Sequence, residues 1–563
     1  MCGIAGVIGK GADLEVLQKM LLVQKHRGPD NTGKFFAQNI ALGHNRLSII
    51  DLSEGANQPF FDTKNRYVTI FNGEIYNYLE LKNELNYDFK TNSDTEVLLA
   101  SYIKWGVKCL DRLNGMFSFA IWDQEEKKFF AARDRFGVKP FYYQKNDQGF
   151  YFSSEIKALF AAGINREPDK QVWANYFAYG SYGMPNKTFW QDIQQLPGGH
   201  YLEYSHDELN ITKWYHFEEA INLNIELSKE EIKRKYIELL EDSIKLRFRS
   251  DVPVGINLSG GLDSSTLLTF VNKRISKESI EAFTFYTNND YYDELPWVKS
   301  MINHTKNRLN EVLLTPESIQ NLADEINNFQ DEPFGGIPTI AYSQIFNRAR
   351  EKGTIVLLDG QGMDEQWAGY DYYVKSGNTN IQGVNKSPFR KNVLSDELLT
   401  LAVKPEYPKP FDDHILNLQY RDLFYTKIPR ALRFNDRVSM AYSTELREPF
   451  LDYRLVEFAF SLPLEYKIKG NVHKYLLREI VSEILPNEVT YAPKRPLQTP
   501  QREWMANELR GFSESAVDFI EESGFSNWFK IDSLKKEWQK YLDGDQDSSF
   551  YLWQWYNFYL LMN

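Results

Sequence analysis

The sequence is poor in cysteine, in long apolar runs and in paired metal ligands. Only Cys2 and Cys109 occur among 563 residues, which excludes a disulfide framework and fits a reducing, cytoplasmic compartment. No apolar stretch approaches the length of a membrane span, and the chain begins Met1-Cys2-Gly3-Ile4 instead of with a basic and then apolar leader. We therefore expect neither export nor membrane insertion. The histidines form no pattern typical of zinc sites, so any metal should have oxygen ligands.

An excess of positive charge is also absent. The 77 acidic and 65 basic residues give a net charge of −12, which disfavours nucleic acid as a partner. Hydrophobic residues at 42% and charged residues at 25% are typical of a globular protein. Because 563 residues exceed what one hydrophobic core usually organises, we expect at least two domains.

The hydrophobic pattern changes between the two halves of the chain. Up to about residue 205, short alternating runs separated by turns such as Asn72-Gly73, with helices over 14–25 and 95–105, predict an α+β domain with antiparallel sheets. After about residue 228, apolar strands over 252–258 and 354–358 alternate with helices, which is typical of a covered parallel sheet. We predict domains at 1–210 and 228–563. The second becomes mainly helical from about residue 425 and ends in an aromatic run, 550–562, that is either a docking surface or core.

One loop predicts a site for pyrophosphate. Ser259-Gly260-Gly261-Leu262-Asp263-Ser264-Ser265 follows a predicted strand and precedes a helix predicted over 264–273. Glycines let backbone N–H groups face a concavity, and the helix N-terminus favours negative charge there. Asp263 would repel phosphate unless a divalent cation lies between them, which implies Mg²⁺. Without the Gly-Lys-Ser/Thr of a Walker loop, the segment favours chemistry that splits ATP between its α and β phosphates.

A second loop should lie beside the first. Residues 357–365 run from a buried strand through Asp359, Gly360, Gln361 and Gly362 to Asp364. Ligands of an open parallel sheet bind beyond the carboxyl ends of its strands, where both loops would lie. Asp364 is therefore predicted as the second metal ligand, and a solvated acidic turn is the alternative.

Cys2 is a candidate nucleophile because of its position. A small penultimate side chain permits removal of Met1, which would place a free α-amine on the same residue as the thiol. Such an amine has a pKa near 7.7–8.0 and can accept the thiol proton. A retained Met1 would block this chemistry.

Three groups downstream could complete a glutamine site around Cys2. Arg46 can bind a substrate α-carboxylate, Asp94 can hold an α-ammonium, and the Asn72 amide with the Gly73 N–H can form an oxyanion hole. Taken singly, Arg46 and Asp94 are more typical of surface ion pairs and Asn72-Gly73 of a hairpin turn. The prediction depends on the constellation.

The ordered motifs resemble those of the glutamine-dependent asparagine synthetases over nearly the whole chain. The segments that carry the resemblance are 1–4, His26-Arg27-Gly28-Pro29-Asp30, 45–51, 72–77, 132–140, 154–157, 259–265, 360–370, 436–452 and Lys474. The resemblance implies a class II glutamine amidotransferase domain with an Ntn-type αββα sandwich. An α/β synthetase domain with a parallel sheet, a pyrophosphate loop and a helical C-terminal part would follow.

The resemblance also implies a reaction and its residues. Cys2 would release ammonia from glutamine, and the second domain would activate a carboxylate as an acyl-adenylate that ammonia converts to an amide. The glutamine pocket would comprise Arg46, Leu47, Ser48, Ile49, Ile50, Asn72, Gly73, Glu74 and Asp94. The ATP site would comprise Leu258, Ser259, Gly260, Gly261, Leu262, Asp263, Ser264, Ser265, Phe285, Asp359 and Gly360, with Mg²⁺ on Asp263 and Asp364. Catalytic roles would fall to Cys2, Asn72, Gly73, Lys474 and Gln361, and a homodimer is an open alternative.

Gln361 departs from the family pattern. Familiar asparagine synthetases carry Gly-Glu-Gly-Ser-Asp where this chain has Gly360-Gln361-Gly362-Met363-Asp364, and an amide cannot act as a carboxylate base. Aspartate remains the favoured acceptor, which makes the chain a ligase of asparagine biosynthesis. Another carboxylate acceptor and a non-catalytic nucleotide sensor remain alternatives. Ring closure of the β-lactam synthetase type is disfavoured because it needs no glutaminase.

Overall fold

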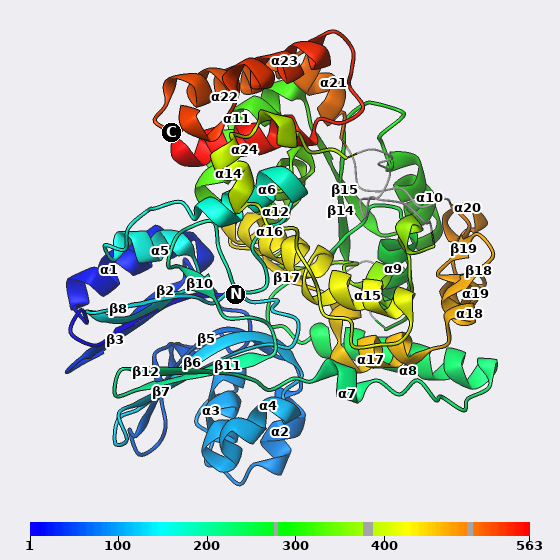
Figure 1. The fold of residues 1–563 in the computed structure, drawn as a ribbon. Helices are drawn as coiled ribbons and strands as arrows, with labels where there is room; N and C mark the ends of the chain where they lie inside the picture. Colours follow the sequence, from blue (N-terminus) through cyan, green and yellow to red (C-terminus); the bar gives the residue numbers. More distant parts are fainter. Residues whose placement is uncertain (275–279, 375–386, 493–498) are drawn as a thin grey trace.

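The computed structural model describes residues 1–274, 280–374, 387–492 and 499–563. Two stacked antiparallel sheets occupy the first part of the chain, and a parallel sheet wrapped in helices occupies the second (Figure 1). The predicted α+β and α/β halves are confirmed.

The first sheet contains the N-terminal strand near its centre. Every residue of that strand is buried, because it pairs on both sides and is covered on both faces. The strand order is β10 (Gln194–Gln195), β8 (Tyr142–Asn146), β9 (Gly149–Ser153), β1 (Gly3–Ile8), β3 (Ile40–Arg46) and β2 (Asn31–Ala37).

The second sheet stacks on the first through apolar side chains. Phe129 of one sheet and Phe152 of the other have ring centroids 5.0 Å apart, within a buried cluster drawn from both sheets. The strand order is β12 (Glu208–Lys213), β11 (His200–Ser205), β7 (Lys128–Arg133), β6 (Gly115–Asp123), β5 (Tyr67–Ile75) and β4 (Phe60–Phe61). The predicted limit at residue 210 falls inside β12, and the domain bounds stay a prediction.

Helices cover the outer faces of this pair of sheets. On the first sheet lie α1 (Leu14–Val23), which Asp13 caps by accepting two backbone N–H bonds, and α5 (Ile156–Ala161). On the second lie α2 (Tyr78–Glu84), α3 (Asp94–Trp105) and α4 (Cys109–Arg112) (Figure 1). This layering is the predicted αββα sandwich.

The predicted hairpin turn at Asn72-Gly73 is wrong. Asn72 and Gly73 form no hairpin turn but lie inside β5, paired with Ser118 and Phe117 of β6. Gly73 has φ +154°, and a Cβ there would lie 2.1 Å from the Met116 carbonyl oxygen. Glycine is therefore required at position 73 because the backbone of β6 comes very close. An Asn-Gly pair in the sequence does not distinguish this requirement from that of a hairpin turn.

The parallel sheet has helices on both faces. Among the described residues its order is β15 (Arg308–Leu313), β14 (Glu281–Tyr286), β13 (Val254–Asn257), β16 (Val356–Leu358) and β17 (Glu445–Arg447). Neighbouring Ala282 and Phe283 point to opposite faces: Phe283 packs in the cluster of α12 (Ile337–Glu351) and α16 (Lys427–Ala441), and Ala282 in that of α8 (Lys229–Arg247) and α9 (Leu262–Arg274). Strand β17 was not expected, because it is three residues long within a helical stretch.

Further helices complete the fold. They are α6 (Lys170–Tyr179), α7 (Phe217–Ala220), α10 (Leu295–Thr305), α11 (Pro316–Gln330), α13 (Met363–Gln366), α14 (Asp396–Leu401), α15 (His414–Phe424), α17 (Tyr453–Ser461), α18 (Leu464–Lys467), α19 (Tyr475–Val481), α20 (Asn487–Thr490), α21 (Gln501–Ala506), α22 (Arg510–Glu522), α23 (Ile531–Leu542) and α24 (Phe550–Met562). A two-stranded hairpin joins β18 (Ile468–Lys469) to β19 (Val472–His473).

The aromatic C-terminal run is core. It forms α24, most of whose residues are buried, and Tyr556 stacks on Phe512 of α22 at 4.3 Å between ring centroids. Of the two alternatives for this segment, the docking surface is therefore wrong. Within the described ranges, no helix combines the length and apolarity needed to cross a bilayer.

Candidate active sites

Cys2 lies in the core of the first domain beside its predicted neighbours. Its backbone N–H donates to the Asn72 side-chain oxygen at 3.1 Å, and its thiol lies 3.9 Å from the Leu47 carbonyl oxygen. Cys2 is 7% exposed, and burial raises the pKa of its thiol. The nucleophile and the Arg46–Ile50 segment, separated by more than 40 residues in sequence, are thus brought together.

Asn72 has the geometry of an oxyanion donor. Its side-chain oxygen accepts from Cys2, which directs the amide nitrogen away from that contact. That nitrogen is buried and has no hydrogen-bond partner among the described residues. A buried amide donor without an acceptor is costly, and a developing oxyanion would satisfy it.

The predicted carboxylate and ammonium binders are both buried near this site. Arg46 donates to Ser53 O and Asn57 Oδ1, each at 2.8 Å, and to Asp51 O. Asp94 accepts from the Ile75 N–H at 2.9 Å, and burial raises the pKa of its carboxyl to about 6. The interpretation of these two residues as surface ion-pair groups is therefore wrong, since neither is exposed and neither forms an ion pair in the described residues.

Met1 connects this site to the second domain. Its ammonium lies 3.0 Å from Glu445 of β17, and its side chain packs in a cluster with Leu47, Ile49 and Ile50. Arg447 of the same strand pairs with Glu445 at 2.6 Å and with Glu74 at 3.5 Å. Met1 therefore lies beside the predicted glutamine pocket.

The predicted pyrophosphate loop runs from β13 into α9. The helix begins at Leu262, two residues before the predicted start, so Gly260 and Gly261 form the turn. The Ser259 and Ser264 hydroxyls lie 3.1 Å apart at the helix N-terminus. Backbone N–H groups and serine hydroxyls thus lie around one concavity, at the positive end of the helix dipole. This arrangement favours phosphate binding.

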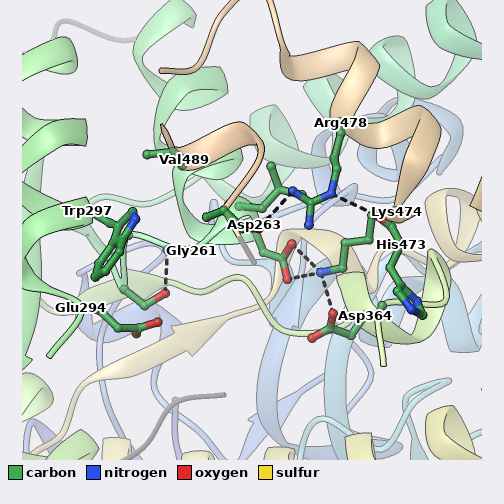
Figure 2. A pocket seen from close by; sticks show the side chains of 14 residues that line it. Gly261, Asp263, Glu294, Trp297, Asp364, His473, Lys474, Arg478 and Val489 are labelled. Carbon is green, nitrogen blue, oxygen red and sulfur yellow. Dashed lines mark hydrogen bonds and ion pairs between the residues drawn. The ribbon is translucent and has the colours of Figure 1, made fainter. Parts of the chain in front are cut away.

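Two carboxylates and a lysine meet at this concavity. Lys474 Nζ lies 2.7 Å from both oxygens of Asp263 and 2.6 Å from Asp364, so one ammonium bridges the two loops (Figure 2). Gly369 permits this approach, because a Cβ there would lie 2.0 Å from an Asp364 oxygen. Burial alone would lower the pKa of Lys474, but the two carboxylates raise it, which keeps the ammonium charged.

A cavity of about 140 Å³ opens beside this cluster. Its wall includes Trp297, His473 and Arg478 as well as the loop (Figure 2). Arg478 adds a second cation one helical turn after Lys474, on α19. Sequence reasoning missed Arg478, although the spacing of four between two basic residues was available as a signal.

A larger adjoining cavity of about 440 Å³ contains the other predicted ATP residues. Leu258, Phe285, Asp359 and Gly360 line it, together with Gln361. Gln361 and Asp359 both line this cavity, and burial raises the pKa of the Asp359 carboxyl. Two cations missed by sequence reasoning, Lys427 and Arg430 of α16, also line this cavity.

The donor set for a metal is small. In the described ranges no group of three or more histidine, cysteine or acidic side chains forms a metal cage. Asp263 and Asp364, held together by one lysine, nevertheless fit Mg²⁺, which commonly takes one or two carboxylates and completes its shell with phosphates and water.

A buried ion pair between Arg27 and Asp436 connects the Cys2 site to the second domain. Arg27 donates to the Cys2 carbonyl at 3.1 Å, to Glu155 at 3.0 Å and to both oxygens of Asp436 at 2.9 and 3.2 Å. Asp436 lies on α16, the helix that also carries Lys427. Helix α16 therefore contacts both the larger cavity of the second domain and, through Arg27, the Cys2 site.

Known proteins match both parts of the chain. The family model described as glutamine amidotransferase domain matches residues 1–215, and that described as asparagine synthase matches 235–563. Asparagine synthetase [glutamine-hydrolyzing] 3 of Bacillus subtilis (strain 168) is 32% identical over 540 residues, covering 88% of this chain and 86% of that protein. Asparagine synthetase [glutamine-hydrolyzing] 1 of the same organism is 29% identical over 620 residues, covering 98% and 95%. A solved structure of the allosteric regulatory enzyme of purine biosynthesis covers 56% of this chain and 80% of its own, at 14% identity and a TM-score of 0.31.

A buried cysteine directly before the first strand of an αββα sandwich, joined to a parallel sheet with a glycine-serine loop, defines a glutamine amidotransferase coupled to an ATP-using synthetase. The chain belongs to the asparagine synthase family.

Proposed function

We propose that this protein is a glutamine-hydrolysing asparagine synthetase that converts aspartate to asparagine, with ATP cleaved to AMP and pyrophosphate. The observation that carries the proposal is the convergence of Asp263, Asp364 and Lys474 at the carboxyl edge of the parallel sheet. This cluster provides charge at the point where a loop built for pyrophosphate meets a larger cavity. The domains of this proposed enzyme are 1–210 and 228–563.

The glutaminase step uses one residue as nucleophile and base. Removal of Met1 would convert the Cys2 nitrogen, now 3.1 Å from Asn72 Oδ1, into a free α-amine. That amine accepts the thiol proton as sulfur attacks the glutamine side-chain amide. The Asn72 amide N–H and the Gly73 N–H stabilise the oxyanion, while Arg46 and Asp94 orient the substrate at its α-carboxylate and α-ammonium. The α-ammonium of Cys2 passes the thiol proton to the amide nitrogen as the C–N bond breaks, so ammonia leaves and a thioester remains, which water later hydrolyses.

In the synthetase step, the phosphates and the adenosine of ATP bind to different residues. The backbone and hydroxyls of residues 259–265 bind the β and γ phosphates, while Leu258, Phe285 and Gly360 border the adenosine. Asp263 and Asp364 would hold Mg²⁺, which would supply neutralisation of the phosphate charge. Lys474 and Arg478 stabilise negative charge on the departing pyrophosphate and on the acyl-adenylate. A carboxylate oxygen of the acceptor attacks the α-phosphorus.

The larger cavity suits a small dicarboxylic amino acid. Lys427 and Arg430 can bind carboxylates, and Glu365 can hold an ammonium. Lys427 lies 5.0 Å from the Tyr370 ring, so an aromatic face supports its charge. These groups, with the reacting carboxylate directed at the loop, support aspartate as acceptor.

An acceptor screen tests the proposal. The protein is incubated with ATP, Mg²⁺ and either glutamine or ammonium, and pyrophosphate and amide are measured for aspartate, glutamate and simple monocarboxylic acids. We expect asparagine, AMP and pyrophosphate in equal amounts with aspartate. Pyrophosphate release with another acid but not with aspartate would reject the acceptor. If no acid releases pyrophosphate although nucleotide binds, the protein is a nucleotide sensor.

Mass spectrometry of the purified chain tests the first step separately. The proposal requires Cys2 as the first residue wherever glutaminase activity is found. Full glutaminase activity in protein that retains Met1 would contradict the amine-activated nucleophile.

A further inference from the structure

Glu448 is a buried carboxyl that the proposed mechanism does not use. It follows β17 directly, as Asp359 follows β16, and these strands are parallel neighbours with Leu358 opposite Arg447. The Asp359 N–H donates to the Arg447 carbonyl at 2.9 Å. Glu448 and Asp359 therefore lie side by side at the carboxyl edge of the sheet, where ligands of such sheets bind.

The Glu448 side chain has no partner that explains its burial. It is 5% exposed, and among the described residues its carboxylate makes no hydrogen bond and no ion pair. Burying an unpaired carboxyl costs several kcal/mol. Such a group has no obvious structural benefit, which favours a chemical role.

Glu448 also lies between the two domains. It borders a cavity of about 10 Å³ whose opposite wall is formed by Met116, Phe136 and Val138 of the first domain. That volume is on the scale of a single water-sized molecule. Nitrogen released at Cys2 has to cross this boundary to reach the synthetase cavity.

The loop that carries Gln361 packs on the segment that carries Glu448. A Cβ at Gly362 would lie 2.5 Å from a methyl carbon of Leu451, which leaves no gap between the loops. Gln361 has no carboxylate to offer the incoming nitrogen. Glu448 provides a carboxylate at the end of the neighbouring strand β17.

We propose that Glu448 is the base that takes a proton from the nitrogen nucleophile as it adds to the acyl-adenylate. This inference rests on the proposed function. Ammonia donates its electron pair to the acyl carbon, and the C–N bond forms. One proton moves from the now cationic nitrogen to the Glu448 carboxylate. The tetrahedral intermediate then collapses, the bond from carbon to the phosphate oxygen breaks, and AMP leaves with that electron pair.

The surrounding charges are consistent with a base that works near neutral pH. Burial, and to a smaller extent nearby Asp359 and Asp134, raise the pKa of Glu448, while Lys139 and Arg247 lower it, and the resulting pKa is about 8. A base functions best when its pKa lies near the working pH. The nitrogen-transfer step should therefore accelerate as the pH rises through about 8, because the ionised carboxylate becomes available.

The test separates adenylation from nitrogen transfer. Glu448→Gln and Glu448→Asp are compared with Glu457→Gln, a matched control on α17 whose carboxyl hydrogen-bonds Tyr215 away from both cavities. Each variant is assayed for glutaminase activity, acceptor-dependent exchange of labelled pyrophosphate into ATP, and amide formation with glutamine and with ammonium. The glutamine reaction is repeated from pH 6 to 10, about two units on either side of the pKa of Glu448.

The proposal predicts one pattern. Glu448→Gln should keep glutaminase and exchange activities, which also show that it folds, and should lose amide formation with both donors by about 100-fold or more. Glu448→Asp should recover part of the loss, and the rise in rate through about pH 8 should vanish in Glu448→Gln. The Glu457→Gln control should behave as wild type.

Three results would overturn the assignment. They are amide formation at the wild-type rate in Glu448→Gln, equal loss of exchange and amide formation, and an unchanged pH profile. If Asp359→Asn instead abolishes amide formation while exchange persists, Asp359 is the base. Absence of exchange in the wild type with every acid would reject the proposed function itself, and this inference with it.

Discussion

The Arg27→Met substitution would break the buried ion pair that joins the two domains. The guanidinium of Arg27 is fully buried on a short helix, η1 (Lys25–Arg27), and contacts Asp436 through two hydrogen bonds. Methionine is of similar length and apolar. The substitution leaves the Asp436 carboxylate buried and removes a donor from the Cys2 carbonyl.

The expected loss of stability follows from the burial of both charges. Removing one partner of a buried pair costs about 3–5 kcal/mol, because the remaining charge is uncompensated. With an unfolding entropy of about 2.1 cal/mol/K per residue, the 563-residue chain would melt about 2.5–4 °C lower if it unfolds as one unit. The control is Arg112→Met, whose pair with Glu84 is about half exposed and should contribute at most about 1 kcal/mol.

Differential scanning calorimetry measures the shift in melting temperature. Activity assays show which of the two sites is affected. Replacing Asp436 by Leu in the Arg27→Met background should recover part of the lost stability, since no unpaired charge then remains in that pair. Glutamine-dependent synthesis should fall more than ammonium-dependent synthesis, because only the former needs the Cys2 carbonyl held in place. A melting shift no larger than that of Arg112→Met would refute the reasoning.

Three further predictions concern the two sites. Cys2→Ala should abolish glutamine use and leave ammonium-dependent synthesis, measured by amide formation; equal loss with both donors would contradict separate sites. Asp263→Asn should remove pyrophosphate release, because a carboxylate that fits Mg²⁺ is lost; unchanged turnover at limiting Mg²⁺ would show that assignment to be wrong. Because burial raises the pKa of Asp94 to about 6, its carboxyl is neutral below that pH and cannot pair with an ammonium. The KM for glutamine should thus fall as the pH rises through about 6, and the same dependence in Asp94→Asn would refute this.

The parts of the fold that depend on local hydrophobic patterns could be predicted from the sequence. The alternation of the first half and the apolar strands of the second identify the sheet types, and residues 259–265 lie at a strand-to-helix junction as expected. The short strand β17 was not predictable, because three residues pair only when β16 is already in place. Gly73 shows a similar limit, since the demand for glycine comes from the neighbouring strand β6.

The sequence motifs indicated the candidate site residues, but not the ion pairs between residues that are distant in sequence. Cys2 lies beside Asn72 and near Arg46, and Lys474 contacts Asp263, while the roles of these residues stay predictions. The pairing of Arg27 with Asp436 spans 409 positions, and no local pattern reports it. Glu448 belongs to the 436–452 segment of the resemblance, but the sequence alone indicated no role for this one acidic residue among 77. Its burial without a partner emerges only when the loops pack.

Isotope transfer in one reaction tests the central claim most directly. The protein is given glutamine labelled with ¹⁵N in its side-chain amide and aspartate labelled with ¹⁸O in its side-chain carboxylate, with ATP and Mg²⁺ and an excess of unlabelled ammonium. Mass spectrometry of the products should find ¹⁵N in asparagine and ¹⁸O in AMP. The account is contradicted if ¹⁸O appears in inorganic phosphate with ADP as the nucleotide product, or if the asparagine carries only unlabelled nitrogen.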